Sequence, residues 1–240
     1  MNANDPLVAA TEASKQYGLG TAKVVAVHDA TCEVFAGQQI ALIGPSGSGK
    51  SSLLNLLAGL ETPTSGTVTW PALGPRESLR PQLVAVVFQT PSLMAPLDVL
   101  ENVAFPLLLA GHSQVLARAR AIAALERLDL SDLAAKLPEE LSGGQAQRVA
   151  AARALAMEAR IIFADEPTGQ LDEETAERVI GLVMRASQET GAALVVSTHD
   201  ERVANRLAIR WDMGDGTLRT TAQSNSQTNL DGLNFQREGH

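Results

Sequence analysis

The chain has 240 residues, of which 45% are hydrophobic and 3% aromatic, and its formal net charge is −8 at pH 7. This length suffices for one large α/β domain, or for one domain with an inserted subdomain, and the core must be built mainly from Leu, Val, Ile and Ala. The negative charge argues against a general nucleic-acid binder, because such a protein needs a basic surface to displace counterions.

Cysteine content and hydropathy limit the environment in which the chain works. Cys32 is the only cysteine, so no intrachain disulfide and no cysteine-based metal cluster forms, and a reducing compartment is expected. Residues 1–10 lack the basic start and long apolar run of a signal peptide. The most apolar stretch, 99–111, is interrupted by polar residues and Pro106 and is too short to span a bilayer. We therefore expect the protein to act on a membrane, if at all, from the aqueous side.

The first part of the chain predicts strands and one helix. Apolar stretches separated by glycines predict strands at 7–11, 24–35 and 38–43. A glycine-rich loop at 44–50 follows, and the apolar run 53–60 predicts a helix that ends near Gly59. A pair of strands with a turn at 71–75 is predicted over 66–87.

The second part alternates helices with short buried strands. Residues 91–155 are predicted to be mostly helical, with Asp98 and Glu101 forming a capped helix start. A buried strand at 161–164, an amphipathic helix at 173–188 and a second buried strand at 192–197 follow. This alternation implies a mostly parallel sheet with crossover helices, and the polar tail 220–240 is predicted to be flexible.

The strongest chemical signal is the glycine-rich loop between a strand and a helix. Its residues, taken together with the next serine as a nucleotide-binding set, are Gly44, Pro45, Ser46, Gly47, Ser48, Gly49, Lys50, Ser51 and Ser52. Glycines let backbone N–H groups turn toward phosphates, and the helix N-terminus adds positive potential. In this pattern Lys50 reaches the β- and γ-phosphates and the Ser51 hydroxyl ligates Mg²⁺. The alternative is a glycine-rich turn that binds nothing, and the strand–loop–helix context favours phosphate binding over it.

Two acids end the strand predicted at 161–164. Asp165 and Glu166 would lie at the carboxyl edge of the sheet, beside the phosphate loop. Asp165 would hold Mg²⁺ through water, and Glu166 would act as the catalytic general base on the attacking water. Taken alone, two acids after a strand are more often a solvated turn, but the phosphate loop in the same domain favours the catalytic interpretation.

A short turn at a helix start carries a family resemblance. It consists of Ser142, Gly143, Gly144 and Gln145, preceded by Leu141. Together with the glycine-rich loop and the two acids, it resembles the signature of the ABC transporter nucleotide-binding domain. That family uses the turn, which is an anion site at a helix N-terminus, to clasp the γ-phosphate of ATP bound to the opposite subunit. The alternative is an ordinary helix cap.

The resemblance assigns roles to four further residues. Gln89 matches the glutamine that touches Mg²⁺ and senses the membrane partner, and Asp172 matches an acid at the subunit interface. His199 matches the switch histidine that contacts the γ-phosphate, which adds it to Glu166 and Lys50 as a catalytic residue. Tyr17, the only tyrosine, matches more loosely the aromatic residue that stacks on adenine, and a tyrosine at the edge of the core is the alternative.

The resemblance covers about residues 7–219 and implies an α/β P-loop NTPase. Its mostly parallel, RecA-like core would span about 1–90 and 156–219, with an N-terminal antiparallel β-subdomain, and an α-helical subdomain would be inserted at about 91–155. No internal repeat is present, so the resemblance implies a homodimer that holds two ATP–Mg²⁺ between its copies.

Residues 100–107 and 165–172 are similar to the lipoprotein-release and macrolide-export group of this family. That similarity implies integral-membrane permease subunits as partners, no nucleic acid, and a peripheral place at the cytoplasmic face of a bacterial cell membrane through the permease alone. One alternative is an ABC ATPase without a permease, which would activate cell-wall hydrolases or act on nucleoprotein. Another is a regulatory module that has lost hydrolysis, against which Glu166 and His199 argue.

Overall fold

The structure is a computed structural model that describes residues 5–18, 23–169 and 171–220. Gln170 and residues 221–240, including the tail predicted to be flexible, lie outside the described part. The elements in chain order are β1 Val8–Tyr17, β2 Val24–Val34, β3 Gln39–Ile43, α1 Lys50–Leu57, β4 Ser65–Thr69, η2 Arg76–Ser78, β5 Val84–Val87, α2 Val99–Leu109, α3 Gln114–Arg127, η3 Ser131–Leu133, η4 Pro138–Glu140, α4 Gly143–Ala156, β6 Ile161–Asp165, α5 Glu173–Thr190, β7 Ala193–Thr198, α6 Glu201–Ala204, β8 Ile209–Gly214 and β9 Thr217–Thr220.

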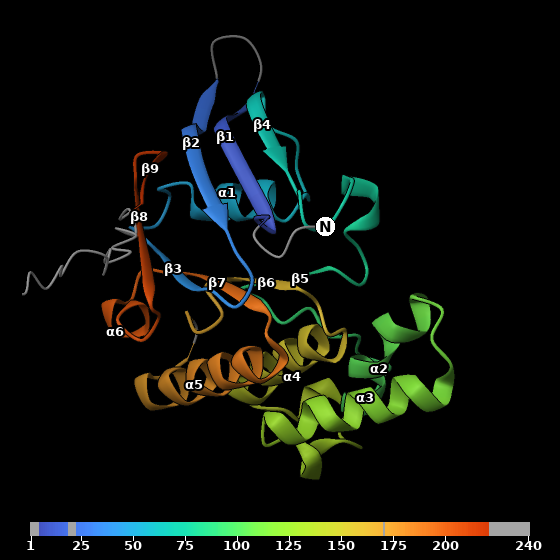
Figure 1. Cartoon of the computed structure of the whole chain (residues 1–240). Coiled ribbons are helices and arrows are strands. Elements are labelled where there is room, and N and C mark those ends of the chain that lie inside the picture. The colour runs from blue at the N-terminus through green and yellow to red at the C-terminus, as the bar shows by residue number, and fades with distance from the viewer. Residues whose placement is uncertain (1–4, 19–22, 170, 221–240) are drawn as a thin grey trace, which may run out of the picture.

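The strands described form one mixed sheet in the order β4-β1-β2-β9-β8-β3-β7-β6-β5. The central strands β8, β3, β7, β6 and β5 are mutually parallel, whereas β1 pairs antiparallel with β2 and with β4. The predicted α/β class is therefore confirmed, with a mostly parallel core and an antiparallel part built from the N-terminal strands (Figure 1). Where the helical subdomain begins and ends stays a prediction of the sequence.

The central strands separate two hydrophobic cores. Because successive side chains of a strand point to opposite faces, Ile40 and Leu42 of β3 enter one core and Ala41 and Ile43 the other. The first core contains α1 and the N-terminal strands, and the second contains α2, α3, α4 and α5. Figure 1 shows α1 between the N-terminal strands and the central strands, with α4 and α5 on the opposite side. The loop before α1 is thereby placed at the ends of the central strands.

The two strands predicted over 66–87 exist, but their predicted pairing with each other is wrong. β4 pairs with β1, and β5 pairs in parallel with β6. Gly66 has φ +72°, and a Cβ there would lie 2.0 Å from the Glu12 carbonyl oxygen, so only glycine lets β4 approach β1 this closely. The chain between the two strands instead covers the end of α1, where Trp70 Nε1 donates to the Leu57 carbonyl at 2.8 Å. Non-local partners thus override the local hairpin signal.

The mostly helical prediction for 91–155 agrees with α2, α3 and α4. The capped start is present, because Asp98 accepts from Glu101 N at 2.7 Å and Glu101 accepts from Asp98 N at 3.0 Å. The short helix α6 and the antiparallel pair β8–β9 were not predicted from the sequence. Among the helices of the described residues, none combines the length and the hydropathy that crossing a bilayer requires.

Candidate functional site

The glycine-rich loop joins the end of β3 to α1, and neighbouring backbone dictates its glycines. A Cβ on Gly44 would lie 2.1 Å from the Met213 carbonyl oxygen of β8. A Cβ on Gly49, which has φ +100°, would lie 2.0 Å from the Ala26 carbonyl oxygen of β2. Any side chain at these positions would force the strands apart, so the tight loop requires glycine at both of them.

The N-terminus of α1 has no side-chain cap, unlike those of the other α-helices described. Gly49 occupies its N-cap position and offers no side chain, whereas Asp98, Ser142 and Asp172 cap α2, α4 and α5. The first N–H groups of a helix have no partner within the helix, and the helix dipole makes this end positive. The α1 terminus can therefore accept an anion, and phosphate is the group that glycine-rich loops of this kind hold.

Lys50 is a buried cation at the start of α1, with a relative exposure of only 5%. Its Nζ donates to the carbonyl oxygens of Gly44 at 2.9 Å and Pro45 at 3.1 Å. It also lies 3.2 Å from Glu166 Oε1, which supplies the opposite charge that a buried ammonium needs. The ammonium is thus held on the inner side of the loop.

Glu166 is the point on which the other candidate groups converge. Gln89 Nε2 lies 3.4 Å and His199 Nδ1 3.5 Å from its Oε2, while Lys50 holds Oε1. Its backbone has φ +43°, a conformation rare outside glycine that is often stored at functional sites. The structure therefore brings together four residues that are far apart in the sequence. A carboxylate surrounded by an ammonium, an imidazole and an amide can accept a proton from a bound water.

Ser197 joins this cluster although the sequence analysis did not identify it. Its Oγ donates to Asp165 Oδ1 at 2.5 Å and accepts from Glu166 N at 2.9 Å, so it fixes both acids. Ser197 is fully buried at the end of β7 and pairs with Asp165 in the parallel register of β6 and β7. A signal was available, because a serine and an acid that both end buried parallel strands must meet at one sheet edge.

Lys50, Gln89 and Glu166 of this cluster border a hollow of about 430 Å³ over the α1 terminus. Tyr17, with a relative exposure of 39%, forms its far wall. The lining residues are Tyr17, Ala26, Ser46, Gly47, Gly49, Lys50, Ser51, Ser52, Gln89 and Glu166. One aromatic ring, one ammonium and a glycine cradle in a single hollow suit a molecule with a planar base at one end and phosphates at the other.

The oxygen donors near the loop fit Mg²⁺ only together with phosphate. Within the described residues no group of three or more His, Cys, Asp or Glu could hold a metal ion. Ser51, Gln89 and Asp165 instead offer hydroxyl, amide and carboxylate oxygens. Mg²⁺ is usually bound by one or two carboxylates plus phosphate oxygens and waters, so this donor set suits a magnesium–nucleotide complex.

The signature turn is not part of this hollow. Ser142 caps α4 by accepting from Gln145 N at 3.3 Å, and Gln145 Oε1 accepts from Ser142 N at 2.8 Å. The ordinary helix cap considered from the sequence is therefore present. Because a serine hydroxyl both accepts and donates, this cap leaves its hydrogen available to another acceptor. None of the residues that line the hollow comes from 142–145.

Asp172 likewise serves its own helix. Its carboxylate accepts from Thr175 N at 3.0 Å at the start of α5, and this backbone hydrogen bond holds the pKa of Asp172 below its usual range. Gly144 packs near the same residue, because a Cβ on Gly144 would lie 2.5 Å from Thr175 Cγ2. The start of α4 and the start of α5 therefore form one contiguous part of the surface.

Sequence relatives cover nearly the whole chain. The ABC transporter family matches residues 27–169. The lipoprotein-releasing system ATP-binding protein LolD of Legionella pneumophila (strain Paris) is 42% identical over 222 residues, which are 90% of this chain and 98% of that protein. The protein of the same name from Bordetella pertussis (strain Tohama I) is 38% identical over 225 residues, which are 91% of this chain and 97% of its own.

Solved structures agree with the sequence relatives. The dimeric structure of an ATP-binding cassette in a post-hydrolysis state, bound to ADP and Pi, is 35% identical with a TM-score of 0.78, covering 89% of this chain and 98% of its own. The structure of cbiO1 from Clostridium perfringens, part of an ABC transporter complex, is 28% identical with a TM-score of 0.79, covering 90% of this chain and 88% of its own. The range matched by the family, 27–169, contains the glycine-rich loop, both acids and the signature turn.

Proposed function

This chain belongs to the ABC transporter family, and on that premise we propose that it is the ATPase subunit of a lipoprotein-releasing system. As a member of this family it binds and hydrolyses ATP. The observation that carries the ATPase role is the convergence of Lys50, Gln89 and His199 on the carboxylate of Glu166 beside an uncapped helix N-terminus. The 42% identity to a lipoprotein-releasing system ATP-binding protein supports the type of system.

We assign the chemistry to this cluster. When ATP enters, Lys50 exchanges the Glu166 carboxylate for phosphate oxygens, and the carboxylate becomes free to orient water. Glu166 accepts a proton as the water oxygen bonds to the γ-phosphorus and the bond from that phosphorus to the β-phosphate bridging oxygen breaks. His199 donates a hydrogen bond to the γ-phosphate as its charge is redistributed. Mg²⁺, held by Ser51, Gln89 and Asp165, would neutralise phosphate charge.

We further propose that the active form is a homodimer with two ATP molecules between its copies. Ser142–Gln145 and Asp172 would face the phosphate loop of the partner subunit. The free hydrogen of the Ser142 hydroxyl and the positive end of α4 suit a γ-phosphate that no group of the same chain holds from this side. The related dimeric cassette bound to ADP and Pi supports this arrangement.

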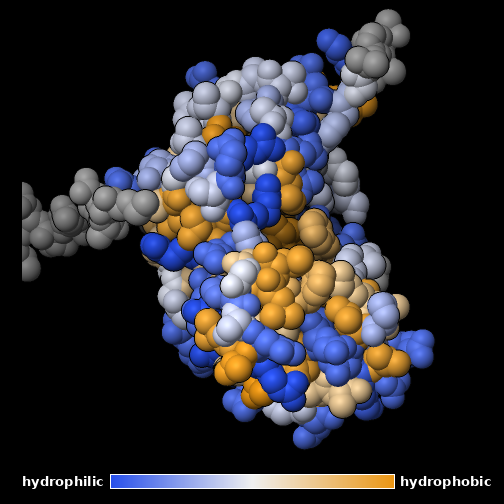
Figure 2. Space-filling model, turned by 90° about the vertical axis from the view of Figure 1, so that its right-hand side faces the viewer, coloured by the Kyte–Doolittle hydropathy of each residue, from blue (hydrophilic) through white to orange (hydrophobic). Residues whose placement is uncertain are grey.

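The partner in the membrane would contact the helical region that contains α2 and α3. A groove of about 220 Å³ there is lined mainly by apolar side chains, among them Leu100, Ala104, Phe105 and Leu108. Figure 2 shows hydrophobic side chains gathered over this part of the surface. Exposed apolar surface of this kind is typical of a protein contact. The chain would reach the cytoplasmic face of the membrane only through such a permease.

A pull-down from native membranes tests the permease partnership. Tagged Glu166→Gln protein with ATP is expected to recover a permease with few transmembrane helices and a large extracytoplasmic domain. Lys50→Ala protein, which lacks the phosphate-binding ammonium, is the matched control and should recover less of it. Recovery of a many-helix permease would retain a transporter and reject the lipoprotein-releasing type. Recovery of no membrane protein, from bait shown to bind ATP, would favour an ABC ATPase that works without a permease.

A further inference from the structure

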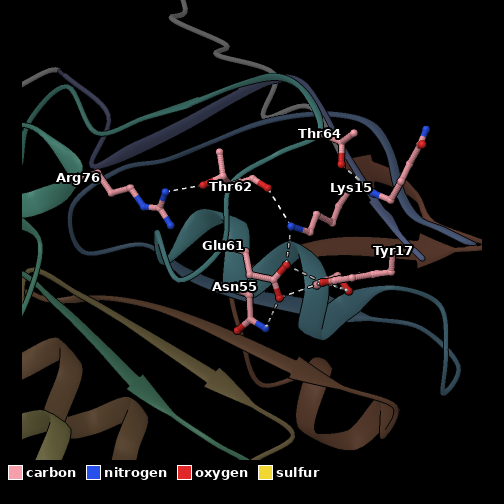
Figure 3. A network of polar contacts seen from close by, with 9 residues as sticks. Lys15, Tyr17, Asn55, Glu61, Thr62, Thr64 and Arg76 are labelled. Carbon is pink, nitrogen blue, oxygen red and sulfur yellow. Dashed lines mark hydrogen bonds and ion pairs between the residues drawn. The ribbon is translucent and has the colours of Figure 1, made fainter. Parts of the chain in front are cut away.

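The phenol of Tyr17 is held by a carboxylate that lies outside every motif described above. Tyr17 Oη lies 2.9 Å from Oε1 and 2.8 Å from Oε2 of Glu61. The same oxygen lies 3.3 Å from Ser52 Oγ in the first turn of α1. Tyr17, at the end of β1, is therefore tied both to Glu61 and to the helix that follows the phosphate loop (Figure 3).

Glu61 is itself fixed by its surroundings. It follows α1, and its backbone N–H donates to the Asn55 carbonyl oxygen at 3.1 Å. Lys15 Nζ lies 2.9 Å from Glu61 Oε2 and donates to the Thr62 carbonyl oxygen at 3.0 Å. The side chains of Lys15 and Glu61 retain relative exposures of only 16% and 27%, so water competes weakly for this ion pair. Figure 3 shows the two side chains meeting beside Tyr17.

Lys15 also contacts the aromatic ring. Lys15 and Tyr17 are two residues apart on β1 and therefore share a face of the strand. The ammonium lies 5.2 Å from the centroid of the Tyr17 ring, within the range of a cation–π contact. The ring is thus held at its oxygen by Glu61 and Ser52, and over its π-system by Lys15.

At neutral pH the protonation states of Tyr17 and Glu61 favour the hydrogen bond between them. Partial burial and the Glu61 carboxylate raise the pKa of the Tyr17 phenol, although the hydrogen bond with Ser52 lowers it. Burial alone would raise the pKa of Glu61, but hydrogen bonds from Lys15 and Tyr17 outweigh it and hold this pKa below its usual range. The phenol therefore stays protonated and donates a hydrogen bond to an ionised carboxylate. A hydrogen bond to an ionised acceptor is stronger than one between neutral groups.

A purely structural tie between β1 and the segment after α1 does not account for these contacts. The backbone already makes that tie, because Thr64 N donates to the Ser14 carbonyl oxygen at 2.7 Å. The side-chain contacts end instead on a ring that remains 39% exposed and borders the nucleotide hollow. Holding an exposed ring in one orientation is useful when the ring is a binding surface, because a ligand then loses less free energy in ordering it.

We propose that Glu61, supported by Lys15, is a positioning residue that fixes the Tyr17 ring as the stacking surface for the nucleotide base. This inference rests on the proposed nucleotide site and adds to it a residue that sets affinity for the base without touching the phosphates. Its effect passes through the Tyr17 hydroxyl, and it therefore requires that hydroxyl to be present.

The test is calorimetric titration of the full chain with ATP–Mg²⁺ and, separately, with inorganic tripolyphosphate. Glu61→Ala and Tyr17→Phe are each expected to weaken ATP binding by about 3- to 10-fold, because ATP must then order a ring that the hydrogen bond had already fixed. The double variant should be no weaker than either single variant, because both remove one interaction. Tripolyphosphate, which lacks a base, should bind all variants equally. Glu126→Ala, on the exposed side of α3, is the matched control and should bind ATP as the unchanged chain does.

Other results would separate the failure of this inference from that of the proposed site. If Tyr17→Leu leaves ATP affinity unchanged, Tyr17 is not a base-binding residue and the proposed site itself is wrong there. If Tyr17→Leu weakens ATP binding but Glu61→Ala does not, only the positioning role is overturned. Loss of tripolyphosphate affinity in Glu61→Ala, or additive losses in the double variant, would show a general structural role and also overturn it. If Glu61→Ala does not fold, Glu61→Gln, which keeps one acceptor oxygen, should give a smaller loss confined to ATP.

Discussion

Two helix N-termini in this molecule differ in how their backbone N–H groups are capped. The start of α1 has no side-chain cap and is surrounded by the chain's own Lys50, Glu166 and Gln89, which line one hollow. The start of α4 carries a complete capping box made by Ser142 and Gln145 and borders no part of that hollow. The first end is thus uncapped and surrounded by the side chains proposed to act on ATP, and the second is a helix start that is fully capped within its own chain.

In the proposed homodimer, this difference divides the work between the two chains. Groups that must hold and activate a nucleotide come from one chain, where the order of the strands fixes them. Groups that only complete the site can remain on a self-sufficient turn until a partner subunit arrives. Nucleotide binding and subunit closure are therefore separable, and variants on the two sides should fail in different ways.

The largest effect should come from Glu166→Gln. An amide has nearly the same shape but cannot accept the proton of the attacking water, so the turnover number should fall by about 10²- to 10⁴-fold. ATP affinity should persist, since the phosphate loop and Lys50 are unchanged. Phosphate release under saturating ATP measures the first effect and calorimetric titration the second. If Glu166→Gln turns over ATP as fast as the unchanged chain, Glu166 is not the general base.

Lys50→Ala should weaken ATP binding itself. The ammonium is buried and charge-paired, and its contact with phosphate is charge-assisted, so ATP affinity should fall by about 10- to 100-fold. Lys136→Ala, which removes a lysine remote from the loop, is the control. Equal ATP affinity in Lys50→Ala and Lys136→Ala would contradict the assignment of Lys50.

Ser142→Ala should affect hydrolysis but not binding by the single chain. It removes the helix cap, at about 1 kcal/mol of stability, and the hydroxyl proposed to reach the partner's γ-phosphate. Asp98→Ala removes the comparable cap of α2 and is the matched control. We expect turnover to fall by about 10²-fold in the first variant only, measured at equal fractions folded. A similar loss in both variants would mean that Ser142 acts only as a cap.

The parts of the site that could be predicted from the sequence are those whose position is determined by a short segment of chain. Gly44–Lys50 and the pair Asp165 and Glu166 each combine a residue pattern with a strand end, so their neighbourhood follows from the parallel sheet. The pairing of β4 with β1 and the contact of Glu61 with Tyr17 do not follow in this way. Each depends on which distant segment lies alongside, and short-range patterns carry no information about that partner.

Asp172→Asn should have the smallest effect, a small loss of folding stability. It tests how much the negative charge of the α5 cap contributes to that stability. Asparagine caps a helix as well as aspartate does, so within the single chain only the interaction of the charge with the helix start is lost. Because the pKa of Asp172 is lowered in the folded chain, its contribution is present above the unfolded pKa of about 3.9 and disappears as the pH falls through the lower folded value. Denaturant titrations at several pH values should show a small stability difference near neutrality that closes below about pH 4. A difference that persists there would point to a cause other than charge.

The most direct test of the account is the molar mass of Glu166→Gln protein in solution, measured by light scattering with ATP–Mg²⁺ and with ADP–Mg²⁺. We predict twice the chain mass with ATP and the single-chain mass with ADP, and no dimer when Ser142→Ala is combined with Glu166→Gln. A single-chain mass at saturating ATP, from protein shown to bind it, would contradict the proposal that the capped turn at α4 completes the site of a partner subunit.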